Sequence, residues 1–172
     1  HECIIAIDGI EYDDKNIILT MKFYPDVLSI YQIRGITDII SITYGLLAAC
    51  QYIHELGIIH CDIKPENILI KPGPAPKPIL CDFGISLRSE ERHHIGAVCT
   101  VTYRAPEVDF NSEITHHTPE IDVWSIGAVV YYMITGVEMY TFAGVEDSSI
   151  YAAKFFGVTG TTRKERLHGL KK

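Results

Sequence analysis

The sequence predicts an α+β fold in which a short β-hairpin precedes a mainly helical domain. Apolar residues recur at helical spacing from Thr37 to Ile53 and again from Ile121 to Thr135, and a glycine, Gly57 or Gly136, follows each segment. Short runs rich in β-branched residues lie before the first segment and between the two, as expected for strands. With 172 residues the chain can form one domain with a sizeable core.

The N-terminal region predicts the hairpin. We expect a strand from His1 to Ile7, a turn at Asp13–Asn16 and a second strand from Ile17 to Met21. Pro25-Asp26 ends this region, and a short helical segment is expected near Val27 to Ile33.

A second hairpin is expected between the two long helices. Lys71–Pro78 has proline at every second position, so it contains no P-x-x-P motif and does not predict a ligand of SH3 domains. We interpret it as a stiff loop that joins a strand at Ile68–Ile70 to a strand at Ile79–Cys81.

Composition and charge exclude several classes of function. A hydrophobic content of 47% and a charged content of 22% are ordinary for a soluble globular protein. The net charge of −7 argues against a general nucleic-acid binder, which needs a basic face. No uninterrupted apolar run approaches the roughly 18 residues of a membrane span, and His1–Ile10 lacks the features of a signal peptide. We therefore expect neither nucleic acid nor membrane as a partner.

The cysteines and histidines predict a reduced protein without a structural metal. Five cysteines form no C-x-x-C pair, which favours an intracellular location, cytoplasmic or nuclear. His93-His94 and His116-His117 could combine with Cys99, but neither pair has the spacing of a zinc site. We expect no metal role for them.

The most informative stretch is Ile58–Ile70, in which two apolar runs flank the polar loop His60–Asn67. Pro65 excludes a helix through this loop. A second loop, Cys81-Asp82-Phe83-Gly84, also follows an apolar run. The two loops present an acid, a cation, an amide and a second acid. This set suits phosphoryl transfer, because one carboxylate can accept a hydroxyl proton while the other groups hold Mg²⁺ and phosphate.

These motifs resemble those of eukaryotic protein kinases. His60-Cys61-Asp62 with Asn67 is similar to the catalytic loop H-R-D-x-x-x-x-N, and D-F-G follows it. Ala105-Pro106-Glu107 matches A-P-E, and Asp122–Gly127 matches the family's D-x-W-S-x-G. The stretch Thr100–Glu107, T-V-T-Y-R-A-P-E, resembles the branch of cyclin-dependent and mitogen-activated kinases, and F-F-G-V-T-G-T-T in the tail is a weaker match.

The resemblance implies a role for each polar residue of the two loops. Asp62 would be the catalytic base, and Lys64 would stabilise the transferred phosphate, which is the serine/threonine-kinase pattern. Asn67 would act in catalysis and, with Asp82, hold Mg²⁺, whose preferred ligands are hard oxygens. The implied cofactors are ATP and Mg²⁺, and the implied partner is a protein substrate. Solvated loop charges are the alternative reading of these four residues.

The resemblance also implies an adenine site and a division of the chain. Residues 1–24 would be the last two strands of the kinase N-terminal lobe with the hinge, and residues 25–172 the C-terminal lobe, incomplete at its C-terminal end. Met21 would be the gatekeeper, Lys22 and Tyr24 would belong to the hinge, and Leu69 would also contact the nucleotide. An ordinary hairpin is the alternative for this stretch.

Three further residues would support the site. Thr100 resembles the threonine that hydrogen-bonds the catalytic aspartate and lysine, with a plain surface threonine as the alternative. Glu107 would pair with an arginine of a late helix. Asp122 would be buried and accept backbone hydrogen bonds from the catalytic loop, although a simple helix N-cap would also fit. His60 and Phe83 are expected to pack the two loops together.

Cys61 departs from the family pattern, because most members have arginine there. That arginine pairs with a phosphate on the activation segment, which a thiol cannot do. We therefore expect any activity to be independent of phosphorylation through this contact. Cys81 is interpreted as buried filler, with a modifiable thiol at the adenine site as the alternative.

Two functional hypotheses follow from what the resemblance does not cover. The chain contains no glycine-rich loop motif and no V-A-I-K lysine, so ATP would lack part of its enclosure. The first hypothesis is ATP-dependent phosphoryl transfer to serine/threonine hydroxyls, with an N-lobe encoded upstream or supplied in trans. The second is a catalytically silent half-kinase that binds and modulates another kinase or its substrate. The strand at Ile17–Leu19 would also expose an unpaired edge.

Overall fold

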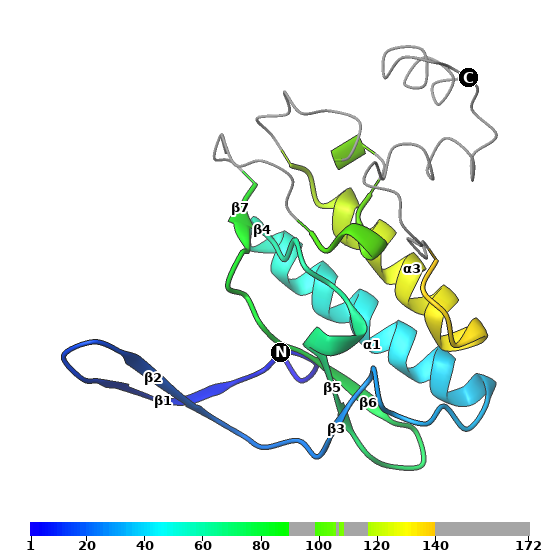
Figure 1. Cartoon of the computed structure of the whole chain (residues 1–172), viewed down its shortest axis with the longest axis horizontal. Helices are drawn as coiled ribbons and strands as arrows, with labels where there is room; N and C mark the ends of the chain where they lie inside the picture. The colour runs from blue at the N-terminus through cyan, green and yellow to red at the C-terminus, as the bar shows by residue number, and fades with distance from the viewer. Residues whose placement is uncertain (90–98, 106, 109–116, 140–172) are drawn as a thin grey trace.

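The computed structural model describes residues 1–89, 99–105, 107–108 and 117–139, and within them two long helices pack beside small antiparallel sheets (Figure 1). In chain order the elements are β1 (Ile7–Tyr12), β2 (Ile17–Met21), β3 (Asp26–Val27), α1 (Ile36–Glu55), β4 (Ile58–Ile59), the 3₁₀ turn η1 (Pro65–Asn67), β5 (Ile68–Lys71), β6 (Lys77–Leu80), β7 (Leu87–Arg88), the 3₁₀ turn η2 (Val101–Tyr103) and α3 (Glu120–Thr135). Mixed α and β content is confirmed. The predicted tail motif at 155–162, the pair His93-His94, His116 and Pro106 lie outside the described residues.

Both predicted helices are confirmed. α1 buries one face, formed mainly by Ile42, Leu46, Ala49 and Ile53, and it ends where Gly57 adopts a left-handed φ of 70°. α3 ends in the same way, because Gly136 has a φ of 73° and donates its N–H to the carbonyl of Tyr132.

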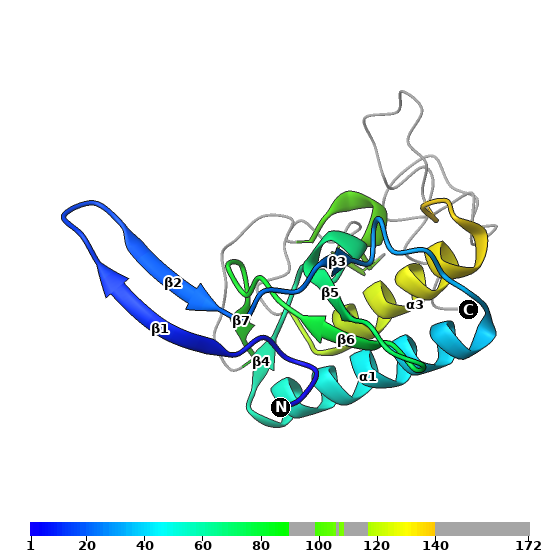
Figure 2. The same ribbon diagram turned by 90° about the horizontal axis from the view of Figure 1, so that it is seen from below.

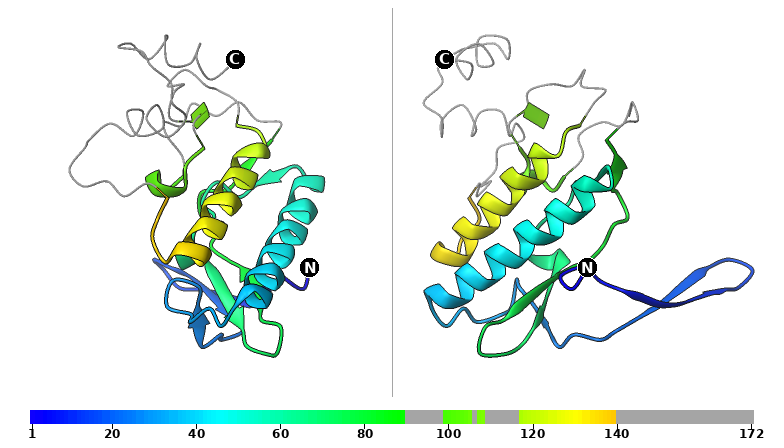
Figure 3. Two further views of the ribbon diagram at one scale, coloured as in Figure 1. Left: turned by 90° about the vertical axis from the view of Figure 1, so that its right-hand side faces the viewer. Right: turned by 180° about the vertical axis from the view of Figure 1, so that it is seen from behind.

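The two helices lie side by side and run in opposite directions (Figure 3). Their packed faces form most of the core, with strand residues from β5 and β6. The buried members are Cys3, Leu28, Ile42, Leu46, Ala49, Cys50, Ile53, Ile63, Ile68, Ile70, Leu80, Tyr103, Ile126, Ala128, Val129 and Met133. α1 also has the length and mean hydropathy, 1.3, of a membrane span, a property that the core helix of a folded domain shares.

Two small sheets position the loops between the helices. β5 lies between β3 and β6 in an antiparallel sheet, and Ile68 pairs with Leu80. The strands predicted at 68–70 and 79–81 are thus found, the second one beginning earlier, at Lys77. β4 pairs with β7 and fixes both ends of the chain segment that contains the two polar loops.

The hairpin β1–β2 projects from the rest of the described structure (Figure 2). The prediction of a strand from His1 to Ile7 was wrong, because Asp13 caps the turn through the N–H groups of Lys15 and Asn16, and the resulting register pairs Tyr12 with Ile17. Residues 3–5 lie instead beside β6, where Leu80 exchanges backbone hydrogen bonds with them.

The predicted helical segment at Val27–Ile33 was also wrong. Val27 pairs with Leu69 in the sheet, so only a single turn follows, in which Ile30 and Tyr31 donate to the carbonyl of Val27. The β-pairing of Val27 takes precedence over the local helical pattern.

One glycine is required by close packing. A Cβ on Gly45 of α1 would lie 2.6 Å from both Cγ and Cδ of Pro78 on β6. The rigid proline ring cannot rotate away, so the contact fixes how closely α1 approaches the sheet.

We expect Gly45→Ala to lower the free energy of unfolding by up to about 2 kcal/mol, because overpacking costs about 1–3 kcal/mol and the helix-propensity gain offsets about 1 kcal/mol of that cost. Denaturant unfolding measures this. The control is Gly127→Ala in α3, where an added Cβ meets nothing within 4 Å, so the variant should gain up to about 1 kcal/mol. Equal stabilisation of both variants would contradict the packing argument.

Candidate active site

The catalytic-loop candidate runs from His60 to Asn67, between β4 and β5. Cys61 takes a left-handed φ of 68°, and η1 places Asn67 at the start of β5. Two further non-glycine residues, Asp82 and Cys99, have φ of 63° and 72°. Each of the three loop segments around the site therefore turns at a left-handed residue, a conformation that L-residues rarely adopt.

Asp62 is the centre of a closed hydrogen-bond network. Its Oδ1 accepts from the hydroxyl of Thr100 at 2.6 Å and from the Thr100 backbone N–H at 3.1 Å. Its Oδ2 pairs with Lys64 Nζ at 2.8 Å and accepts from Asn67 Nδ2 at 3.0 Å. Lys64 Nζ also donates to Thr100 Oγ1 at 2.9 Å. The structure thus brings together four of the predicted site residues.

This network keeps Asp62 ionised. Burial is the largest influence and by itself would raise the pKa of Asp62, but the bonds from Lys64 and Thr100 outweigh it and hold the pKa below its ordinary value. An ionised carboxylate can accept a hydrogen bond from a hydroxyl group.

The loops that carry Asn67 and Asp82 are joined by a backbone hydrogen bond. The N–H of Cys81, which directly precedes Asp82, donates to the carbonyl of Asn67 at 3.0 Å. Asn67 uses Nδ2 to bind both the carbonyl and the carboxylate of Asp62, which leaves its amide oxygen as an acceptor. Asp82 is exposed, and its Oδ1 accepts from the N–H of Gly84 at 3.2 Å. An amide oxygen and a carboxylate fit the hard ligand set of Mg²⁺.

His60 joins the two loops from within the core. Its ring lies edge-on to Phe83, with centroids 4.7 Å apart, and Nε2 bonds the carbonyl of Cys81 at 3.0 Å. Nδ1 accepts from the N–H of Asp62 at 3.2 Å, so the proton of the neutral ring belongs on Nε2. Burial lowers the pKa of His60 below its ordinary value.

Asp122 anchors the loop from α3. Its carboxylate is buried and accepts from the N–H of His60 at 2.8 Å and from the N–H of Cys61 at 2.9 Å. The N-cap of α3 is Pro119, without a side-chain cap bond. His54, in the last turn of α1, also bonds Asp122 Oδ2 at 2.8 Å. Sequence reasoning missed His54, although its position four residues after buried Cys50 was a usable signal.

Cys61 is fully buried in an apolar cluster that joins the catalytic loop to the segment after it. The cluster contains Ile59, Cys61, Leu87, Cys99, Ala105, Val108 and Ile121. Burial raises the pKa of the Cys61 thiol to about 12, so it is neither charged nor placed to bind a phosphate. Burial likewise raises the pKa of the half-buried Cys81 to about 11.

The four candidate adenine contacts are less enclosed. Met21 and Lys22 are exposed, while Tyr24 and Leu69 are half-buried. Lys22 Nζ lies 5.9 Å from the centre of the Tyr24 ring. Leu69 pairs with Val27, which places it beside the strand that follows Tyr24.

The last predicted residue, Glu107, is exposed, and the arginine expected to pair with it is not identified in the described part of the chain. The sequence did not predict one contact of α3 with the segment that begins with Thr100. The hydroxyl of Ser125 in α3 donates to the carbonyl of Tyr103 at 2.8 Å, which fixes η2 and hence that segment.

The family model of the protein kinase domain matches residues 1–166. The chain belongs to the protein kinase family.

Its relatives include mitogen-activated protein kinases, which belong to the branch that the sequence predicted. The chain is similar to mitogen-activated protein kinase pmk-1 of Caenorhabditis elegans, at 31% identity over 97% of this chain and 45% of the relative. It is 36% identical to glycogen synthase kinase 1 of Pyricularia oryzae, over 72% of this chain and 30% of the relative. Mitogen-activated protein kinase pmk-2 of C. elegans is 32% identical to the chain, over 81% of this chain and 36% of the relative. The chain thus spans less than half the length of these relatives.

We expect Asp122→Asn to lower the free energy of unfolding by about 3 kcal/mol, because a charged acceptor of buried hydrogen bonds is lost. Native-state amide exchange should also show faster exchange at His60 and Cys61. The control is Asp38→Asn, which removes another buried carboxylate, bonded to Arg34 and Tyr31 far along α1. If both variants changed the amide exchange rates of His60 and Cys61 equally, the conclusion that Asp122 anchors the loop locally would be refuted.

His60 gives the fold a pH dependence. Its pKa is lowered on folding, so the unfolded state binds the proton more readily, and stability falls as the pH drops below the unfolded value of about 6.5. Urea unfolding at about pH 7.5 and about pH 5.5 measures this loss, which His60→Gln should reduce. Wild type and His60→Gln share all the other histidines. If stability depended on pH equally in the two, His60 would be excluded as the cause of the pH dependence.

Proposed function

We propose that the chain carries the phosphoryl-transfer site of a serine/threonine protein kinase, which transfers phosphate from ATP to protein hydroxyl groups. The observation that carries this proposal is the network in which Thr100, Lys64 and Asn67 all bind the carboxylate of Asp62. A polar surface loop would not need a buried anchor such as Asp122 beneath it.

In this proposal the carboxylate of Asp62 accepts the hydrogen bond of the substrate hydroxyl and takes its proton. Both oxygens of Asp62 are already occupied, so the substrate must take the place of one partner. Lys64 is the partner suited to leave, because its ammonium can move to the transferred phosphate and keep its bond to Thr100 Oγ1. Thr100 then holds Asp62 Oδ1 while Oδ2 faces the hydroxyl.

Asn67 and Asp82 are proposed as the Mg²⁺ ligands. Bound Mg²⁺ neutralises charge on the phosphates of ATP. Asn67 has a further function here, because its Nδ2 fixes the side chain of Asp62 while its amide oxygen is free to bind the ion. Met21, Lys22, Tyr24 and Leu69 are proposed to contact adenine.

We propose residues 1–24 as N-lobe strands with the hinge and residues 25–172 as the C-lobe. Exposed apolar side chains in the hairpin and just after it support a partner at this end, because Ile17 is 66% and Phe23 is 83% exposed. The proposed partner is an N-lobe, in the same polypeptide or in trans. The same surface supports the second candidate, a silent half-kinase that binds another kinase. The proposed location is cytoplasmic or nuclear, where ATP and reduced thiols occur together.

The decisive experiment measures transfer of labelled phosphate from ATP with Mg²⁺ to a generic serine/threonine substrate. Asp62→Ala should lower the rate by about 10²–10⁴-fold, the usual contribution of a general base. Asp14→Ala, an exposed acid in the hairpin turn, is the matched control and should leave the rate unchanged. Equal background in all three proteins would favour the silent half-kinase, and addition of an N-lobe in trans would then show whether an active site can be completed.

The environment of Cys61 predicts how activity is regulated. Since the side chain lies in an apolar cluster and carries no charge, activity should not depend on a phosphate held at this position. Treatment with a phosphatase before the assay is expected to leave the Asp62-dependent rate unchanged. Loss of that rate would show that another group on the chain performs the phosphate contact.

A further inference from the structure

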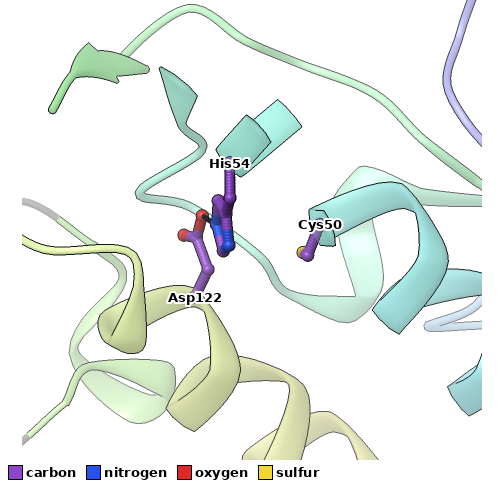
Figure 4. A group of neighbouring side chains, drawn as sticks. All are labelled: Cys50, His54 and Asp122. Atoms are coloured by element: carbon purple, nitrogen blue, oxygen red, sulfur yellow. Dashed lines mark hydrogen bonds and ion pairs between the residues drawn. The ribbon is translucent and has the colours of Figure 1, made fainter. Parts of the chain in front are cut away.

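Three potential metal ligands meet between the two helices, away from the proposed Mg²⁺ ligands. Cys50 and His54 are four residues apart on α1 and therefore share one face of the helix. Asp122 faces them from the first turn of α3 (Figure 4). One ligand atom from each residue lies within 4.8 Å of the others.

The burial of these groups suits a bound ion. Cys50 and Asp122 are buried, and the side chain of His54 is 16% exposed, so His54 is the one of the three ligands that solvent reaches. A thiolate and a carboxylate together carry two negative charges, which a divalent cation neutralises. Bringing the ion into the core would thus leave a site without net charge, and this limits the desolvation cost.

We propose that Cys50, His54 and Asp122 form a binding site for a borderline-soft divalent cation of the Zn²⁺ type. Sulfur, imidazole nitrogen and carboxylate oxygen are all ligands of Zn²⁺, whereas Mg²⁺ prefers oxygen alone. The site is distinct from Asn67 and Asp82, and it is built on two helices, which hold ligands more firmly than loops do.

Binding exchanges protons for the ion. The Cys50 thiol releases its proton to solvent, and the proton of the neutral His54 ring moves to Nδ1 so that Nε2 can bind the ion. The ion then takes the place of the hydrogen bond between His54 Nε2 and Asp122 Oδ2. Their 2.8 Å separation must widen to about 3.3 Å, the spacing of two ligands on a tetrahedral zinc ion. Affinity should therefore rise with pH.

The site is coupled to the catalytic loop through Asp122. Oδ2 accepts from the N–H of His60, and Oδ1 accepts from the N–H of Cys61. An ion on Oδ2 competes with the bond to His60 and leaves the bond to Cys61 in place. Occupancy of the site would loosen one of the two anchors of the loop.

The test uses the full chain and Co²⁺, whose thiolate complexes absorb strongly by charge transfer. Wild type should develop a thiolate-to-cobalt band that Zn²⁺ displaces with one-to-one stoichiometry. Cys50→Ala should lose the band, and its Zn²⁺ affinity should fall on the order of 100-fold or more, since loss of a residue that only supports a ligand already costs about 10–100-fold. The matched control Cys3→Ala removes another buried cysteine and should keep the band.

Circular dichroism first establishes that each variant is folded, and His54→Gln gives a second, independent removal of a ligand. Amide exchange adds a readout apart from activity: Zn²⁺ should speed exchange at His60 more than at Cys61. The proposal is overturned if wild type shows no band, if the band survives in Cys50→Ala, or if Cys3→Ala loses it equally. A band that survives in Cys50→Ala would place the ion on the thiolate of another cysteine, such as Cys81 or Cys99.

Discussion

The site depends on a single buried carboxylate, that of Asp122. Three donors converge on it: two backbone N–H groups of the catalytic loop and the imidazole of the last turn of α1. Because a buried charge is stable only when it is well hydrogen-bonded, the positions of α1, α3 and the loop are mutually dependent. A displacement of α1 along α3 would separate the imidazole of His54 from this carboxylate.

A second carboxylate, Asp62, is held in the opposite way. Asp62 is half-buried. Its partners are the nearby side chains of Lys64 and Asn67, together with the hydroxyl and the backbone N–H of Thr100, 38 residues along the chain. The bonds of Asp122 are made mainly to the backbone, whereas those of Asp62 are made mainly to side chains. The two carboxylates are linked through the loop, because Cys61, whose N–H donates to Asp122, directly precedes Asp62.

Periodicity was sufficient to locate both long helices, because a buried apolar stripe and a terminal glycine leave little freedom in their boundaries. The hairpin was less predictable. The run His1–Ile7 looks like a strand, but the Asp13 turn sets the register and only Ile7 of that run pairs with β2. Val27 was misplaced for a similar reason, since its strand partner is 42 residues away and no local pattern reports it.

In the candidate site, too, contacts within one loop could be predicted from the sequence, whereas contacts between distant segments could not. Asp62, Lys64 and Asn67 lie within one loop, so their proximity could be predicted from the sequence. The spacing of His54 from Cys50 indicated only that it lies on the buried face of α1, because its partner Asp122 lies on α3. The apolar surroundings of Cys61 could not be predicted either, because the members of its cluster come from four separate segments of the chain. Residues whose partners lie far along the chain are those for which the structure was needed.

The left-handed residues around the site have a consequence for the order in which the protein folds. Cys61, Asp82 and Cys99 each hold a backbone conformation that an isolated chain seldom visits. The helices, by contrast, have local sequence support along their whole length. We therefore expect the loops to acquire their shape later than the helices, once α1 and α3 supply the contacts that hold them.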